Sequence, residues 1–150
     1  MTTSDRISAL LREHGIIDGH NDLLWAARDK VSYDFDRLEL NDSTVCQEFG
    51  THTDLPRLRT GGVGAQFWSV YVPATLSGDA AVTATLEQID GGHAMINRYA
   101  DQLALATTVE DVDQAWKQGK VASLMGAEGG HQINESLGTL RMLHRLGVHR

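Results

Sequence analysis

Apolar positions along the chain follow two spacings, one typical of helices and the other of buried strands. Residues 4–14 carry apolar side chains at helical spacing after a polar start. Ile16 and Ile17, of the kind that buried strands favour, then begin a short strand that runs into the polar cluster 18–22. A helical pattern resumes over residues 23–30. The N-terminal part therefore predicts a helix, a short strand with a polar end, and another helix.

The order of a strand followed by a helix is repeated further along the chain. The aromatic and valine-rich stretch from about Val63 to Val72 predicts a strand that Pro73 ends. A helix is expected from about Asp79 to Tyr99, because apolar residues recur on one face. Gly91 and Gly92 lie inside it and each costs about 1 kcal/mol relative to alanine. The helical pattern is therefore weakest at these glycines.

A further helix and a third strand repeat the arrangement. Thr108 and Asp111 have the spacing of a capping box, which opens a helix that closes near Gly119. A short apolar run, Val121 to Met125, predicts the next strand. Glu128 follows it among glycines, at the place that His20 holds after the first strand.

Two further stretches complete the pattern. Residues 137–146 predict a last helix, and the residues after Gly147 predict the start of a fourth strand. From Val31 to Thr53 the sequence is polar and irregular, so we expect a long excursion with weak local structure. Strands that alternate with amphipathic helices imply an α/β fold with a parallel sheet.

The fold class that fits is a (β/α)8 TIM barrel, whose sites lie at the carboxyl ends of its strands. Such a barrel takes about 250 residues. A chain of 150 residues with three predicted strands and the start of a fourth covers about the first half. We therefore expect residues 1–150 to be the N-terminal part of a single barrel domain.

Composition narrows the partners. The formal net charge is -7 and no cluster of basic residues would follow a phosphate backbone, so we expect no nucleic-acid partner. The single cysteine, Cys46, excludes an internal disulfide and a four-thiolate zinc site. Neither a signal peptide nor an apolar run of roughly 18 residues is present, so we expect no membrane segment and a cytoplasmic location.

The residues His20, Asp22 and Glu128 suggest a metal site. His20 and Asp22 lie two positions apart, so in an extended segment their side chains point to the same side. Glu128 would reach the same end of the sheet from another strand. One imidazole and two carboxylates suit zinc or a similar first-row divalent ion. The alternative is an interior histidine beside an aspartate that caps the next helix, and the spacing alone leaves both open.

Five stretches that together span nearly the whole chain resemble the membrane dipeptidase family, also called renal dipeptidases: DGHNDLLW, TDLPRLRTGGVGAQFWSVYVP, TLEQID, GKVASLMGAEGGH and SLGTLRMLHRLGV. They occur in the family's order and spacing. The resemblance implies a (β/α)8-barrel hydrolase with two zinc ions that cleaves dipeptides. It further implies that His20 and Asp22 bind one zinc ion, that Glu128 bridges both ions at the catalytic centre, and that Trp25 and Tyr71 lie near the substrate.

The sequence departs from the family in two ways. Leu24 stands where the family usually has proline, which changes the rigidity of the turn but no ligand. The family's two further zinc histidines, the arginine that holds the substrate carboxylate and the aspartate proposed to shuttle protons lie beyond Arg150. The chain therefore holds about half of the expected site.

The expected activity is hydrolysis of dipeptides by a hydroxide held between two metal ions, with one ion polarising the peptide carbonyl. The expected partner is a small dipeptide, and a homodimer is left open. Two alternatives also remain open. One is a half-barrel or degraded relative that binds a ligand without turnover, and the other is a metal-dependent hydrolase of other amides or lactams.

The other candidate side chains are expected to be structural. His144 and His149 fall at the end of the sheet opposite to the site. His131 is expected to make a structural hydrogen bond. The alternative is that it donates a hydrogen bond to a metal ligand and orients that ligand. Cys46 has no basic neighbour that would make it a nucleophile. Surface or packing roles are expected for the remaining histidines, His14, His52 and His93.

Overall fold

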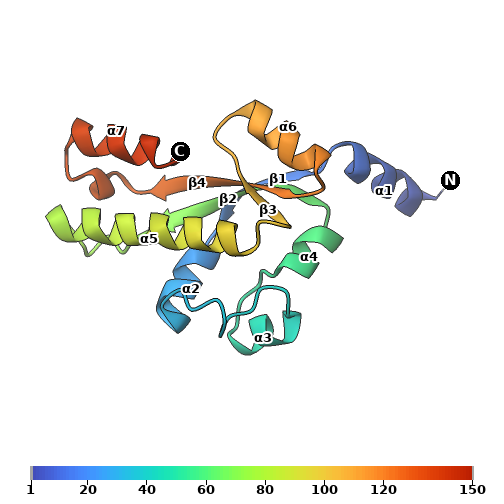
Figure 1. Cartoon of the computed structure of the whole chain (residues 1–150), viewed down its shortest axis with the longest axis horizontal. Coiled ribbons are helices and arrows are strands. Elements are labelled where there is room, and N and C mark those ends of the chain that lie inside the picture. The colour runs from blue at the N-terminus through green and yellow to red at the C-terminus, as the bar shows by residue number, and fades with distance from the viewer. Residues whose placement is uncertain (1, 150) are drawn as a thin grey trace.

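The computed structural model describes residues 2–149 as alternating helices and strands (Figure 1). The strands are β1 (Ile16–Asn21), β2 (Val63–Tyr71), β3 (Leu103–Leu105) and β4 (Val121–Glu128). The helices are α1 (Thr3–Glu13), α2 (Leu23–Val31), α3 (Ser43–Glu48), α4 (Leu55–Thr60), α5 (Gly78–Arg98), α6 (Val109–Lys117), α7 (Leu137–Arg145) and the 3-10 helix η1 (Gly130–Ile133). The predicted alternation of helices and strands is confirmed.

The four strands form one parallel sheet in the order β1-β2-β4-β3. The strand β3 was not predicted, because three residues are too few for an alternating pattern to stand out. Further along β4, Met125 forms a parallel bridge with Val148, where a further strand was expected to start. Since all strands run the same way, their carboxyl ends lie at one edge of the sheet.

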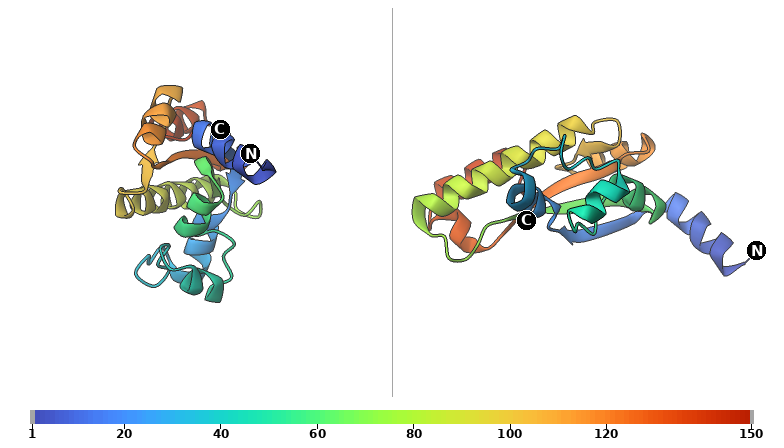
Figure 2. Two further views of the ribbon diagram at one scale, coloured as in Figure 1. Left: turned by 90° about the vertical axis from the view of Figure 1, so that its right-hand side faces the viewer. Right: turned by 90° about the horizontal axis from the view of Figure 1, so that it is seen from below.

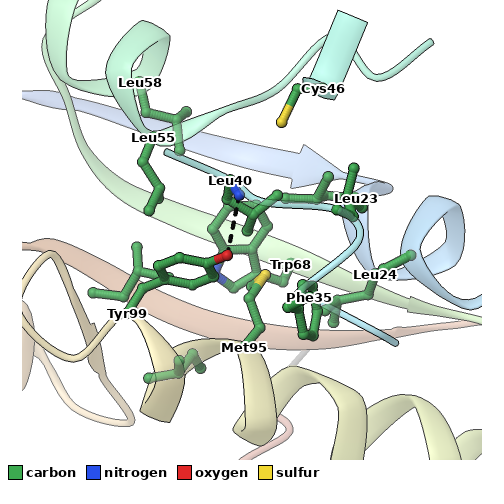
Figure 3. Close-up of a cluster of buried hydrophobic side chains, with 14 of the residues drawn as sticks. Leu23, Leu24, Phe35, Leu40, Cys46, Leu55, Leu58, Trp68, Met95 and Tyr99 are labelled. Atoms are coloured by element: carbon green, nitrogen blue, oxygen red, sulfur yellow. Dashed lines mark hydrogen bonds between the residues drawn. The ribbon is translucent and has the colours of Figure 1, made fainter. Parts of the chain in front are cut away.

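The largest hydrophobic cluster packs α2 and α5 against β2 (Figure 3). Trp68 and Met95 are fully buried in it, and the backbone N–H of Leu40 donates a 3.0 Å hydrogen bond to the hydroxyl of Tyr99. This bond ties the long connection between α2 and α4 to the end of α5. The connection is therefore part of the core.

The prediction of an irregular excursion from Val31 to Thr53 is accordingly wrong in part. It contains α3, which Asp42 caps by accepting hydrogen bonds from the N–H groups of residues 44 and 45. Its apolar side chains lie on successive turns without a regular period, so the sequence pattern gave no signal for their burial. The buried ones are Phe35, Leu38, Leu40 and Cys46.

The two glycines of α5 have a packing role. A Cβ atom at Gly91 would lie 2.4 Å from the ring of Tyr33, and one at Gly92 would lie 2.9 Å from the sulfur of Met125. Neither position has room for a side chain, and the helix continues through both glycines. The cost in helix propensity is therefore offset by close packing against α2 and the sheet.

The N-terminal helix and strand are much less buried. Helix α1 contributes no buried residue and projects beyond the sheet in two different views (Figures 1 and 2). Ile16 and Ile17 are 45% and 64% exposed, so the expectation that they are buried is wrong. They lie on the edge strand β1, which pairs only with β2 among the described residues. Across residues 2–149, no helix combines the length and apolar character needed to cross a bilayer.

Candidate metal centre

The strand β1 ends in a bulge that carries His20. Between residues 18 and 21, β1 advances three positions while the paired β2 advances two. Such an extra residue redirects side chains and is common beside active sites. The Nε2 atom of His20 lies 3.1 Å from Oδ2 of Asp22. The two side chains therefore converge, as their spacing predicts.

Glu128 comes from the middle of the sheet. Seven consecutive pairs join β2 to β4 without a shift, and the last is Tyr71 with Glu128. The strand expected to end at Met125 thus continues through Glu128. The hydroxyl of Ser69 donates a 2.9 Å hydrogen bond to Oε2 of Glu128, and the same oxygen lies 3.6 Å from Nε2 of His20. Regular sheet pairing and Ser69 together fix this carboxylate.

His20, Asp22 and Glu128 form one cluster in which one ligand atom from each lies within 4.8 Å of the others. Two carboxylates face a single imidazole, so the cluster has the donors and the excess negative charge that suit a first-row divalent cation. The three side chains are 54%, 57% and 50% exposed. His20 and Glu128 line a hollow of about 280 Å³ beside Ser69, and His20 and Asp22 line a second hollow of about 340 Å³.

The alternative interpretation is wrong for His20 and holds only in part for Asp22. His20 is an exposed side chain and not an interior histidine. Asp22 occupies the N-cap position of α2, yet its side chain makes no capping hydrogen bond. The N–H of Leu23 instead donates to Oδ1 of Asn21 at 3.0 Å. The carboxylate of Asp22 is thus left facing His20.

Asn21 organises the turn, a role that the sequence pattern did not indicate. Its Nδ2 group donates to Oγ1 of Thr53 at 2.9 Å and to Oε1 of Gln66 at 3.2 Å. Gln66 is fully buried and donates in turn to the carbonyl of Asp18. The residue between the two candidate ligands therefore ties β1 to β2 and to the loop before α4.

The two aromatic residues expected near a substrate contact one another. Trp25 and Tyr71 meet edge to face, with their ring centroids 5.1 Å apart and their planes at 90°. Trp25 follows the His20–Asp22 turn in α2, and Tyr71 is the neighbour of Glu128 in the sheet. The pair therefore stands at the same edge of the sheet as the metal cluster.

The other candidate side chains lie apart from this cluster or have no donor role in it. Burial raises the pKa of Cys46, whose thiol faces the carbonyl of Glu39 at 3.5 Å. His93 donates to the carbonyl of Leu146 at 2.9 Å, and the rings of His144 and His149 meet edge to face. The Nε2 atom of His131 is buried with no hydrogen-bond partner among residues 2–149, so the expected structural bond is wrong for this atom. His14 and His52 are exposed at the surface.

Comparison with known proteins agrees with this geometry. The family described as membrane dipeptidase (peptidase family M19) matches residues 4–150. The chain is 40% identical to dipeptidase ataJ of Aspergillus terreus over 151 aligned residues, and 41% identical to dipeptidase verJ of Clonostachys rogersoniana over 149. The matches cover 95% and 93% of this chain but only 36% and 37% of those proteins. The chain thus spans little more than a third of their length.

Solved structures show the same fold. The crystal structure of dipeptidase AC, a metallopeptidase of family M19, matches with a TM-score of 0.74 and 26% identity, over 89% of this chain and 40% of that one. A metallopeptidase from Rhodobacter sphaeroides, solved with a phosphinate mimic of the dipeptide L-Ala-D-Ala, matches with a TM-score of 0.67 and 23% identity, over 89% and 43%. The α/β fold with a parallel sheet is therefore of the TIM-barrel type, and the chain belongs to the membrane dipeptidase family of metallopeptidases.

Proposed function

We propose that the natural polypeptide carrying this chain is a zinc-dependent dipeptidase whose metal centre includes His20, Asp22 and Glu128. The observation that carries the proposal is the convergence of three ligand atoms within 4.8 Å, from two separate strands, in a chain of a metallopeptidase family. The dipeptidase names of the similar proteins support this substrate class.

The side chains divide into distinct roles in this proposal. His20 and Asp22 would hold one zinc ion, and Glu128 would supply a carboxylate to the same ion and to a second. Ser69 keeps the Glu128 carboxylate in place, since its hydroxyl already donates to Oε2 at 2.9 Å. Zinc, when bound, would polarise the peptide carbonyl and acidify the attacking water.

The donor count indicates that further ligands are required. Two zinc ions with about four ligands each exceed what one imidazole and two carboxylates supply. We propose that the remainder of the natural polypeptide provides them, because the dipeptidases ataJ and verJ are nearly three times longer than the matched region. Trp25 and Tyr71 would then line the substrate side of the centre.

The experiment compares Glu128→Gln with Glu48→Gln in the natural polypeptide. Both changes remove one carboxylate charge, and Glu48 is exposed at the end of α3 and is not one of the three clustered side chains. We expect Glu128→Gln to lower the zinc content per chain and to reduce dipeptide hydrolysis by about 100-fold or more, because a charged ligand is lost. The control should retain both.

The measurements are metal analysis after dialysis and turnover of a dipeptide panel that includes L-Ala-D-Ala. Unchanged zinc content and turnover in Glu128→Gln would refute the role of Glu128. A wild-type protein that binds zinc but turns over no dipeptide would favour the binding module. Turnover confined to other amides or lactams would favour the broader hydrolase.

A further inference from the structure

The stretch TLEQID, which is part of α5, has no side chain in the metal cluster, yet it contacts both segments that carry the aromatic pair. Glu87 bonds to α2, which contains Trp25, and Gln88 bonds to the end of β2, which contains Tyr71. Two consecutive residues of one helix therefore join the supports of Trp25 and Tyr71.

The contact with α2 runs through Arg28. Its Nη2 group donates to Oε2 of Glu87 at 2.5 Å, and Nη1 donates to the carbonyl of Ala84 at 3.2 Å. Arg28 lies three residues after Trp25, so the two side chains leave adjacent turns of the same helix face. Burial, the largest single influence, opposes the charged form of Arg28, but the hydrogen bonds and charges of Glu87 and Tyr33 together outweigh it, so the pKa of Arg28 is raised. Glu87 and Ala84 thus hold the face of α2 from which Trp25 projects.

The contact with β2 runs through Gln88, which is fully buried. Its Nε2 group donates a 2.7 Å hydrogen bond to the carbonyl of Tyr71, and its Oε1 accepts a 2.5 Å bond from the hydroxyl of Tyr33. Both the nitrogen and the oxygen of the Gln88 amide are therefore hydrogen-bonded, which holds the amide in one orientation. Tyr33 is itself held, because its ring packs where a Cβ of Gly91 would be.

We propose that Glu87 and Gln88 are positioning residues that set the separation of Trp25 and Tyr71 and thereby the fit of the substrate between the metal cluster and this aromatic pair. The consequence for substrate recognition rests on the proposed dipeptidase function. The effect on the separation of the two rings, whose centroids lie 5.1 Å apart, does not depend on that function. Substrate binding should depend on this pair more than the chemical step does, because neither ring belongs to the metal cluster.

The test uses Gln88→Met in the natural polypeptide. Methionine has a similar length but cannot donate to the carbonyl of Tyr71. The matched control is Thr85→Val on the same helix, which removes two buried hydrogen bonds, the 2.8 Å bond to the carbonyl of Ala81 and the 3.0 Å bond from Nε2 of Gln132, neither of which involves Trp25 or Tyr71. The indole N–H resonance of Trp25, assigned with Trp25→Phe, reports the ring position without substrate.

We expect the indole resonance of Trp25 to move in Gln88→Met and to stay in place in Thr85→Val. We further expect KM for dipeptides to rise about tenfold while kcat changes less than about twofold and zinc content is unchanged. A purely structural role of Gln88 would instead lower stability in both variants and leave the KM of the folded protein unaltered.

An unmoved resonance in folded Gln88→Met, or a moved resonance with unchanged KM, would overturn the proposal. If Gln88→Met does not fold, Tyr33→Phe removes only the hydroxyl that orients Gln88, and the same shift is expected at smaller size. A wild-type protein without dipeptide turnover would refute the proposed function instead, because the resonance is read without substrate.

Discussion

The α1–β1 and α6–β4 units are built alike but are integrated into the fold to different extents. Each helix opens with a capping box, Thr2 with Asp5 in α1 and Thr108 with Asp111 in α6. Each following strand ends at the candidate metal centre. The same local design therefore delivers a ligand-bearing segment twice.

The two units differ in what surrounds them. Strand β4 pairs with β2 on one side and β3 on the other, and its helix α6 presses Trp116 onto the sheet. Strand β1 has one partner and two register shifts, and α1 buries no residue. Glu128 is therefore placed by regular sheet pairing, whereas His20 and Asp22 depend on the hydrogen bonds of Asn21. The position of Glu128 is thus determined by the sheet, and the positions of His20 and Asp22 by a local turn.

The largest expected effect comes from Gly64→Ala, which attacks the packing of α6. A Cβ atom at Gly64 would lie 1.8 Å from Cζ3 of Trp116, so the indole or the strand must shift. We expect a loss of about 3 kcal/mol in the free energy of unfolding, measured by urea denaturation. Gly138→Ala is the control, because a Cβ there would meet only Ser136 at 3.4 Å. Equal stability of both variants would show that α6 is no better integrated than α1.

The contrast between the units also explains how far the sequence could predict the structure. Regular apolar periods predicted β2 and α5 closely, since both elements are long and pack against the core. The spacing of His20 and Asp22 predicted that their side chains converge, but the bulge and the hydrogen bonds of Asn21 that hold them there were not predicted. The hydrogen bonds of Asn21 could not be foreseen, because its partners Thr53 and Gln66 are far along the chain. The bulge in β1 likewise depends on pairing with β2 and has no signal in the sequence.

A smaller effect is expected from Asn21→Leu, which tests the locally built half of the site. The change removes the donor to buried Gln66 and the acceptor for the N–H of Leu23. We expect a loss of about 2 kcal/mol in the free energy of unfolding, because buried polar groups lose their partners. Metal affinity should fall as well, since the turn carries two candidate ligands.

The measurements for Asn21→Leu are urea denaturation and titration with zinc. Asn97→Leu makes the same chemical change on the exposed face of α5 and should alter neither quantity. An Asn21→Leu protein with wild-type zinc affinity would mean that His20 and Asp22 are held by β1 itself.

The smallest effect on stability is expected at the two capping boxes, where the α1–β1 and α6–β4 units should respond differently to pH. Hydrogen bonds from the backbone of Thr107 and Thr2 lower the pKa of Asp111 and Asp5 respectively. A lowered carboxyl pKa contributes stability that is present above the unfolded value of about 4 and is lost as pH falls through the folded value. Because α6 packs on the sheet and α1 does not, only Asp111 should transmit this loss to the whole fold.

We therefore expect Asp111→Asn to lower stability near neutral pH and to flatten its dependence on pH below about 4, whereas Asp5→Asn should leave both unchanged. The measurement is urea denaturation of both variants and the wild type across an acid pH series. Each substitution keeps a side-chain oxygen that can accept a hydrogen bond, so the comparison isolates the charge. Equal changes in the free energy of unfolding at the two positions would mean that α1 is coupled to the core as firmly as α6. The exposed α1–β1 unit would then contribute to the stability of the fold as the α6–β4 unit does.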